Sequence, residues 1–129
     1  LYDTAGVDDG RPYRVTVSGK RHLVMPYAFD TNDMHFFHTN RFSGDDFADY
    51  VIGAFDWLAK EGERAPKMLS VGLHLRMIGR PGRMAALDRI LAHVAGSGAA
   101  WIAPRADIAR HFLSSCPDTD PVATPYPMP

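Results

Sequence analysis

The sequence predicts an α/β fold built around parallel strands, and three observations lead to this prediction. Short apolar runs typical of buried strands alternate with segments whose apolar residues recur every three or four positions. Residues that favour turns and helix caps separate these segments. The resulting order is a hairpin followed by helix, strand, helix, strand and helix. That order is typical of parallel strands joined by right-handed crossovers.

The first part of the chain predicts a β-hairpin. Residues 13–17 alternate as a strand does, residues 18–20 supply a turn, and residues 23–29 form a second, apolar strand. The first helix follows over residues 43–62. Ser43 has the spacing of a capping box before an apolar stripe that ends near a glycine.

The second part of the chain repeats the alternation. Residues 67–75 are typical of a buried parallel strand, and residues 80–98 predict a helix that Pro81 opens and glycines close. Residues 100–103 form a short strand, and Pro104 suits the start of a last helix. Trp57 lies on the patterned face of the first helix, so we expect it in the core.

Composition describes an ordinary globular domain. Of 129 residues, 46% are hydrophobic and the net charge is −1, which gives no electrostatic reason to expect nucleic acid or a membrane as partner. No apolar run is long enough to span a membrane, and no signal leader is visible. The single cysteine fits a reducing compartment and predicts a cytoplasmic protein. We expect one domain over residues 1–116 and an extended, proline-rich tail over residues 117–129.

Two polar clusters stand where strands end. Residues 30–33, Asp-Thr-Asn-Asp, follow the first apolar strand, a position at which carboxylates carry chemistry in α/β folds. The alternative is a turn or cap cluster, which composition alone favours. His74 ends the strand at residues 67–75 and suits a general acid or base, because its pKa lies near neutrality. A structural, hydrogen-bonded histidine is the equal alternative.

A third cluster, His35 and His38, has the spacing of two metal ligands on one helical turn. The two phenylalanines between them and the lack of a third ligand nearby argue against a metal site. The arginines after His74, at positions 76, 80 and 83, suit a clamp for a carboxylate or an oxyanion.

These segments together resemble a known family. The strings LYD at 1–3, PYAFDTNDM at 26–34, SGDDF at 43–47, PKMLSVGLHLRMIGRPGR at 66–83 and DIARH at 107–111 resemble the C-terminal half of polysaccharide deacetylases. These enzymes form the NodB-homology family, and the nearest branch is the allantoinase-like one.

The resemblance implies part of a distorted (β/α) barrel and hydrolysis of a non-peptide C–N bond. The substrate would be an acetylated sugar or a small cyclic amide such as allantoin. His74 takes the position of the residue that protonates the departing amine, and Asp30 that of the residue that orients the active-site network. The residues implied as substrate contacts are Asp3, Asn32, Asp33 and Arg76.

The resemblance also implies that part of the site is missing. In metal-dependent relatives the zinc ligands and the catalytic base lie in the N-terminal half, and nothing in this sequence corresponds to that half. His35 and His38 lie on the wrong side of the Asp30 motif to be the family's histidine pair. No cofactor is therefore assigned to this chain. We expect a hydrolase that is incomplete as given, an expectation that a first residue other than Met also favours.

The alternative is a non-catalytic half-domain that acts by forming homo-oligomers or by pairing with a separate N-terminal half. A third reading is a sugar-binding remnant of the fold, with aromatic residues such as Trp57 as stacking surfaces.

Overall fold

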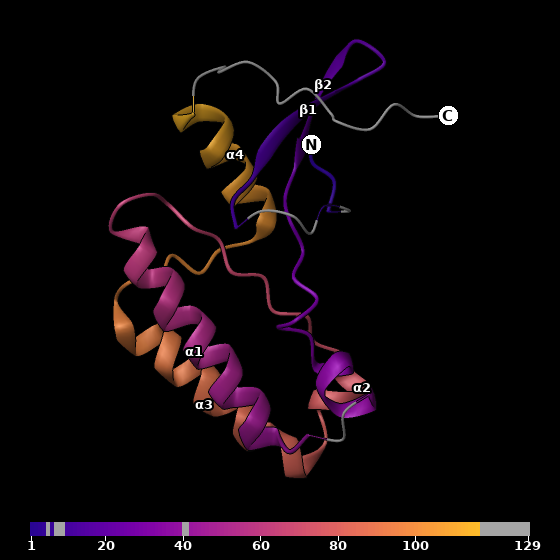
Figure 1. The fold of residues 1–129 in the computed structure, drawn as a ribbon, viewed down its shortest axis with the longest axis vertical. Helices are drawn as coiled ribbons and strands as arrows, with labels where there is room; N and C mark the ends of the chain where they lie inside the picture. Colours follow the sequence, from indigo (N-terminus) through magenta and orange to yellow (C-terminus); the bar gives the residue numbers. More distant parts are fainter. Residues whose placement is uncertain (5, 7–9, 40–41, 117–129) are drawn as a thin grey trace. The chain divides into compact units, whose positions relative to one another are not determined.

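A computed structural model describes residues 1–4, 6, 10–39 and 42–116 (Figure 1). The chain forms two compact units, one from residues 1–26 and 103–129 and the other from Tyr27–Ile102. The predicted proline-rich tail at residues 117–129 lies outside the described residues. Each unit is considered by itself below.

The first unit contains the predicted hairpin. Strand β1 (Tyr13–Val17) pairs antiparallel with β2 (Lys20–Val24). Ser18 and Gly19 form a two-residue turn with φ of 48° and 73°. Positive φ at both positions gives the turn the twist of the strands it joins. The hairpin is confirmed, but β2 ends at Val24 instead of continuing to Phe29, because Val24 already pairs with Tyr13 at the start of β1.

Helix α4 (Arg105–Ser115) completes this unit and begins after Pro104, as predicted. The Arg105 side chain donates hydrogen bonds to the carbonyl oxygens of Met25 and Pro26, at 2.9 and 3.1 Å. Arg14 in β1 donates to the carbonyl oxygen of Cys116 at 2.7 Å. Residues from both ends of the sequence are thus joined in one unit.

The second unit is built on two helices that lie side by side (Figure 1), α1 (Gly44–Gly62) and α3 (Pro81–Ser97). Both were predicted. α1 buries the apolar stripe read from the sequence, and α3 begins at Pro81 and ends before Gly98, whose φ of 65° suits a glycine. A short helix, α2 (Leu75–Ile78), and a π-helical turn, His35–Thr39, pack near them. The core cluster consists of Phe36, Phe37, Phe47, Ala48, Val51, Ile78, Ala86 and Ile90.

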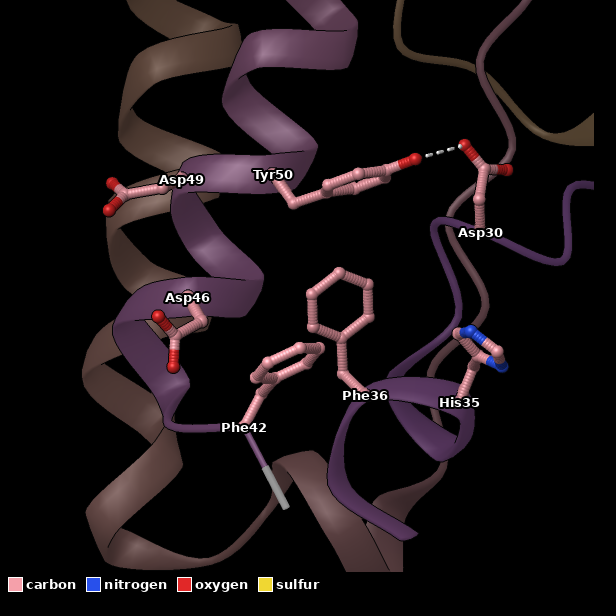
Figure 2. A pocket seen from close by; sticks show the side chains of 7 residues that line it. All are labelled: Asp30, His35, Phe36, Phe42, Asp46, Asp49 and Tyr50. Atoms are coloured by element: carbon pink, nitrogen blue, oxygen red, sulfur yellow. Dashed lines mark hydrogen bonds between the residues drawn. The ribbon is translucent and has the colours of Figure 1, made fainter. Parts of the chain in front are cut away.

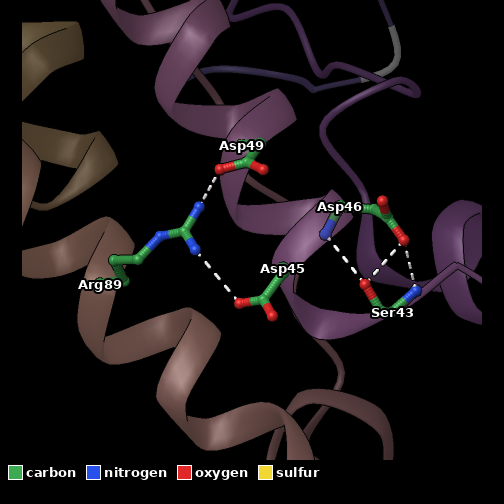
Figure 3. A network of polar contacts seen from close by, with 5 residues as sticks. All are labelled: Ser43, Asp45, Asp46, Asp49 and Arg89. Carbon is green, nitrogen blue, oxygen red and sulfur yellow. Dashed lines mark hydrogen bonds and ion pairs between the residues drawn. The ribbon is translucent and has the colours of Figure 1, made fainter.

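The first turn of α1 carries the predicted capping box (Figure 3). The Asp46 backbone N–H donates to Ser43 Oγ at 3.1 Å, and the Ser43 N–H donates to the Asp46 carboxylate at 2.8 Å. Arg89 of α3 forms ion pairs with Asp45 on this turn and with Asp49 on the next. These contacts fix the start of α1 and its register against α3.

The capping box predicts a pH-dependent stability. Hydrogen bonds from the Ser43 side chain and backbone lower the pKa of Asp46. A carboxyl group whose pKa is lowered on folding stabilises above its unfolded pKa, and this contribution disappears as pH falls through the folded value. Ser43→Ala should destabilise the chain by about 1 kcal/mol near neutral pH. The difference between the variant and the unchanged chain should shrink in acid, as measured by urea unfolding at several pH values. A difference that stays constant into strong acid would contradict this account.

Two predicted strands are absent. Residues 67–75 contribute one parallel bridge, between Asn32 and Gly72, and residues 100–103 are irregular. A strand requires a neighbour along its length, and the described part of the chain supplies one only at Gly72. Two leucines of the predicted strand at residues 67–75 are exposed instead of buried, Leu73 at 42% and Leu75 at 90%.

Trp57 also departs from expectation, because it is 62% exposed. Its indole N–H donates to Glu61 at 2.8 Å, and Lys60 lies over its ring. Among the described residues, no helix is both long and apolar enough to cross a membrane.

Candidate functional site

The candidate site is formed where the segments after the two apolar runs meet. Gly72 N–H donates to the carbonyl oxygen of Thr31 at 2.9 Å, and Asp33 N–H donates to the carbonyl oxygen of Gly72 at 3.0 Å. The Thr31 hydroxyl donates to the carbonyl oxygen of Ser70 at 2.6 Å. The Asp-Thr-Asn-Asp cluster and the segment before His74 therefore lie side by side in parallel. The sequence had placed each of them after an apolar run without pairing the two runs.

This pairing places Asp33 against His74. Oδ1 of Asp33 lies 2.7 Å from Nδ1 of the His74 ring, and Oδ2 accepts the His74 backbone N–H at 2.8 Å. The Asp33 side chain is fully buried, whereas the His74 side chain keeps 28% of its surface exposed. A buried carboxylate thus holds both the backbone and the ring of a histidine that solvent reaches. Such a contact fixes the orientation of the ring and favours a proton on Nδ1.

The local chain conformation leaves little freedom around this pair. Asn32 Nδ2 donates to the Tyr27 hydroxyl at 2.6 Å, and Asn32 Oδ1 accepts the Met34 N–H at 2.9 Å. A Cβ at position 72 would clash with the Tyr27 hydroxyl and lie 2.9 Å from Asn32 Nδ2. Glycine at position 72 therefore lets the two segments approach closely.

Gly72→Ala is expected to destabilise the chain by roughly 1–3 kcal/mol, the usual range for overpacking a close contact. Removing the clashing hydroxyl with Tyr27→Phe should recover part of that loss in the double variant. Urea unfolding of the two single variants and the double variant measures this coupling. Strictly additive losses would show that the Tyr27 hydroxyl is not what excludes a side chain at position 72. Gly53→Ala is the matched control, because a Cβ there meets no atom within 4 Å.

The other predicted site residues are placed differently. Asp30 is exposed, and its Oδ2 accepts a hydrogen bond from the Tyr50 hydroxyl at 3.0 Å. Arg76 is exposed on α2, and its carbonyl oxygen accepts Arg80 Nε at 3.3 Å. Asp3 belongs to the first unit, where its backbone pairs with that of Leu23.

Asn32 and Asp33 were also predicted to contact the substrate. The Asn32 side chain bonds protein groups at both its nitrogen and its oxygen, and Asp33 has no exposed surface. Direct contact with a substrate requires surface that Asp33 does not have. The structure thus buries Asp33 against His74 and leaves Asn32 half-buried in support of the loop.

A metal site in this chain would need several His, Cys, Asp or Glu side chains close together. Among the side chains that the structure describes, which exclude that of His38, no three His, Cys, Asp or Glu side chains gather as a metal site would require. His35 is exposed and lines a pocket beside α1. No catalytic step is assigned to a metal held by these residues.

Comparisons with known proteins identify relatives of the chain. No protein-family profile matches the chain. The chain is 40% identical over 97 residues to the "Putative polysaccharide deacetylase" of Schizosaccharomyces pombe, a match that covers 74% of this chain and 30% of that protein.

Solved structures show the same relationship. A "probable Polysaccharide deacetylase" of Pseudomonas aeruginosa PAO1 is 47% identical with a TM-score of 0.84, and Puue allantoinase is 48% identical with a TM-score of 0.85. Each match covers 92% of this chain and 40% of the solved one.

A third solved structure, from Mycobacterium smegmatis, is 21% identical with a TM-score of 0.82 and shows likeness of fold alone. It covers 98% of this chain and 45% of the solved chain. The chain is a mixed α/β fragment that matches part of the family's fold, and the described residues do not show the barrel of which it was expected to be a part. The chain belongs to the polysaccharide deacetylase family, with Puue allantoinase among its structural neighbours, and spans about 40% of the length of the Pseudomonas aeruginosa and Puue allantoinase chains.

Proposed function

We propose that this chain supplies part of the active site of a hydrolase that cleaves non-peptide C–N bonds of the amide type. The observation that carries the proposal is the buried Asp33 carboxylate, which holds His74 by ring and backbone while the ring keeps 28% of its surface exposed. Polysaccharide deacetylation and allantoin hydrolysis, the activities named by the relatives, both cleave such a bond.

In the proposed reaction, His74 is the general acid. Water attacks the amide carbonyl, the C–N bond breaks, and His74 Nε2 gives its proton to the departing nitrogen. The Asp33 carboxylate, 2.7 Å from Nδ1, holds the ring so that Nε2 is the nitrogen that donates to the departing group. The base that takes the proton from water is assigned to the part of the family domain that the matched segment does not include.

The residue that we propose to orient His74 is Asp33 and not Asp30. The sequence assigned the orienting role to Asp30, whereas the geometry supports Asp33, whose oxygens lie 2.7 and 2.8 Å from His74 nitrogens. Arg76 remains a proposed substrate contact, since its guanidinium is exposed two residues after His74. Asp3 remains a proposed wall of the substrate pocket.

A second candidate function, assembly with another polypeptide, also has a specific observation behind it. Four large apolar side chains that the strand pattern marks for burial are more than 40% exposed in the second unit: Leu73, Leu75, Trp101 and Ile102. Exposure of this kind is unfavourable in a separate domain and is relieved when further strands cover it. A separate N-terminal half or a second copy of this chain would provide that cover.

The test is a hydrolysis assay with two classes of substrate, an N-acetylated sugar oligomer and allantoin. The chain is assayed by itself and after mixing with a polypeptide that supplies the rest of a family domain. Activity that appears only in the mixture supports the proposal, and native mass spectrometry of the same samples shows which assembly carries it. A mixture that assembles but cleaves neither substrate would overturn the hydrolase and leave assembly as the function.

A further inference from the structure

We propose that the pocket beside the first half of α1 binds a small organic cation of the alkylammonium class. The pocket has a volume of about 510 Å³ and lies within the second unit. It is lined by Asp30, His35, Phe36, Phe42, Asp46, Asp49 and Tyr50. The proposal concerns these residues alone and is independent of hydrolysis at His74.

The first argument is the arrangement of aromatic rings (Figure 2). The Phe36 ring lies between the other two, with its centroid 5.3 Å from that of Phe42 and 5.1 Å from that of Tyr50. The rings are tilted by 47° and 55° to Phe36, so the three pack as a tilted cluster. Phe36 is buried in it, whereas Phe42 and Tyr50 keep 46% and 45% of their surface exposed at the pocket. Ring faces carry negative electrostatic potential, so exposed rings suit quaternary and alkylated ammonium groups.

The second argument is charge. Among the residues that the structure describes, the lining contains three carboxylates and neither lysine nor arginine. Asp49 is already paired with Arg89 and points away from the rings, and Asp46 is held by the Ser43 cap (Figures 2 and 3). Asp30 faces the rings, and its partner in the structure is the neutral hydroxyl of Tyr50. Its negative charge is therefore available to a cation in the pocket.

Tyr50 belongs to the ring cluster and also bonds Asp30. Burial and the hydrogen bond to Asp30 raise the pKa of the Tyr50 hydroxyl, so the group stays protonated and donates. That bond holds the carboxylate beside the Tyr50 ring, within reach of an ammonium group on that ring's face (Figure 2). An uncharged ligand of the same size would gain the apolar contact but not the ion pair.

The experiment titrates the purified chain with tetramethylammonium chloride while NMR follows the ring protons of Phe36, Phe42 and Tyr50. Sodium chloride at the same concentrations controls for ionic strength, and tert-butanol is the neutral probe of similar shape. We expect saturable shifts with the ammonium probe and a Kd of about millimolar, as for a small exposed site. No saturable shift, or equal affinity for tert-butanol, would overturn the proposal.

Variants then separate charge from shape. Asp30→Asn should weaken binding of the ammonium probe by about fivefold and leave tert-butanol unchanged. Phe42→Leu keeps apolar volume but removes a ring, and should weaken the cation by roughly two- to fivefold. Asp88→Asn makes the same charge change at an exposed position outside the pocket and should have no effect. Loss of binding in Asp88→Asn equal to that in Asp30→Asn would reduce the effect to net charge and overturn the site.

Discussion

Replacing Asp33 with asparagine is expected to lower hydrolysis by about 100-fold or more in the assembly that shows activity. The reason lies in the number of acceptors that His74 needs. Its backbone N–H and its ring Nδ1–H both point to Asp33, at 2.8 and 2.7 Å, and a carboxylate accepts both. An amide has one oxygen. Because the backbone N–H is always a donor, the amide oxygen must stay there and the NH₂ group must face the ring.

The ring then has to accept at Nδ1, which leaves it as the neutral tautomer with its proton on Nε2. A neutral imidazole is a much weaker acid than the imidazolium that the proposed mechanism uses. The loss therefore appears in turnover more than in substrate affinity, because the ring no longer donates in the transition state. His74→Ala should lose a similar amount, and the double variant little more than either single one, since the two residues act as one unit.

The control variants decide between the two aspartates. Asp30→Asn changes the other carboxylate of the Asp-Thr-Asn-Asp segment, and His22→Ala removes an exposed histidine of β2. Both should retain most of the activity. If Asp30→Asn lost as much turnover as Asp33→Asn, the orienting role would return to Asp30. Wild-type-like turnover in His74→Ala would remove the proposed acid altogether.

The sequence was sufficient to predict the local structure where the signals were local. The hairpin turn, the Ser43 capping box and the proline at the start of α3 all depend on residues within one turn of each other, and all were confirmed. The apolar runs at residues 67–75 and 100–103 were a different case. Whether such a run becomes a strand depends on neighbours elsewhere, and here a single bridge at Gly72 is what the described residues provide.

The candidate site was predicted as a region and not as a contact. The sequence placed the Asp-Thr-Asn-Asp segment and His74 each at the end of an apolar run without pairing the two runs, and the structure brings them together. It did not identify Asp33 as the partner of His74, because that depends on the register of one bridge, Asn32 with Gly72. A shift of that register would present a different residue of the segment to the histidine. The glycine at position 72, in a run of larger apolar residues, was the available signal for close approach.

Trp57 and Phe47 show the same limit on helix α1. Both follow the apolar pattern, yet Phe47 is fully buried and Trp57 is 62% exposed. The stripe on α1 is wider than the surface that α3 and the segment around Phe36 cover. Periodicity predicts which face of a helix is apolar, but the extent of its burial depends on what packs there.

Phe47→Ala is accordingly expected to destabilise the chain by about 3–5 kcal/mol, the usual cost of emptying a fully buried phenylalanine site. The ring centroid of Phe47 lies 5.3 Å from that of Phe36 and 5.5 Å from that of Phe37. These residues come shortly after Asp33, so Phe47 ties α1 to the segment that carries the His74 partner. A loss of this size is a large fraction of the total stability of an ordinary domain.

Trp57→Ala is the matched control, because it removes a larger aromatic side chain from the same helix. Its ring contacts Lys60 and its N–H bonds Glu61, both on the surface, so its removal should cost about 1 kcal/mol or less. Urea unfolding followed by circular dichroism compares the two variants, since α1 and α3 supply most of the helical signal. Equal losses would mean that Trp57 is covered in solution, as it would be if a second polypeptide packed on α1. Because dilution separates weakly bound partners, repeating the unfolding at lower protein concentration would then reduce the cost of Trp57→Ala and leave that of Phe47→Ala unchanged.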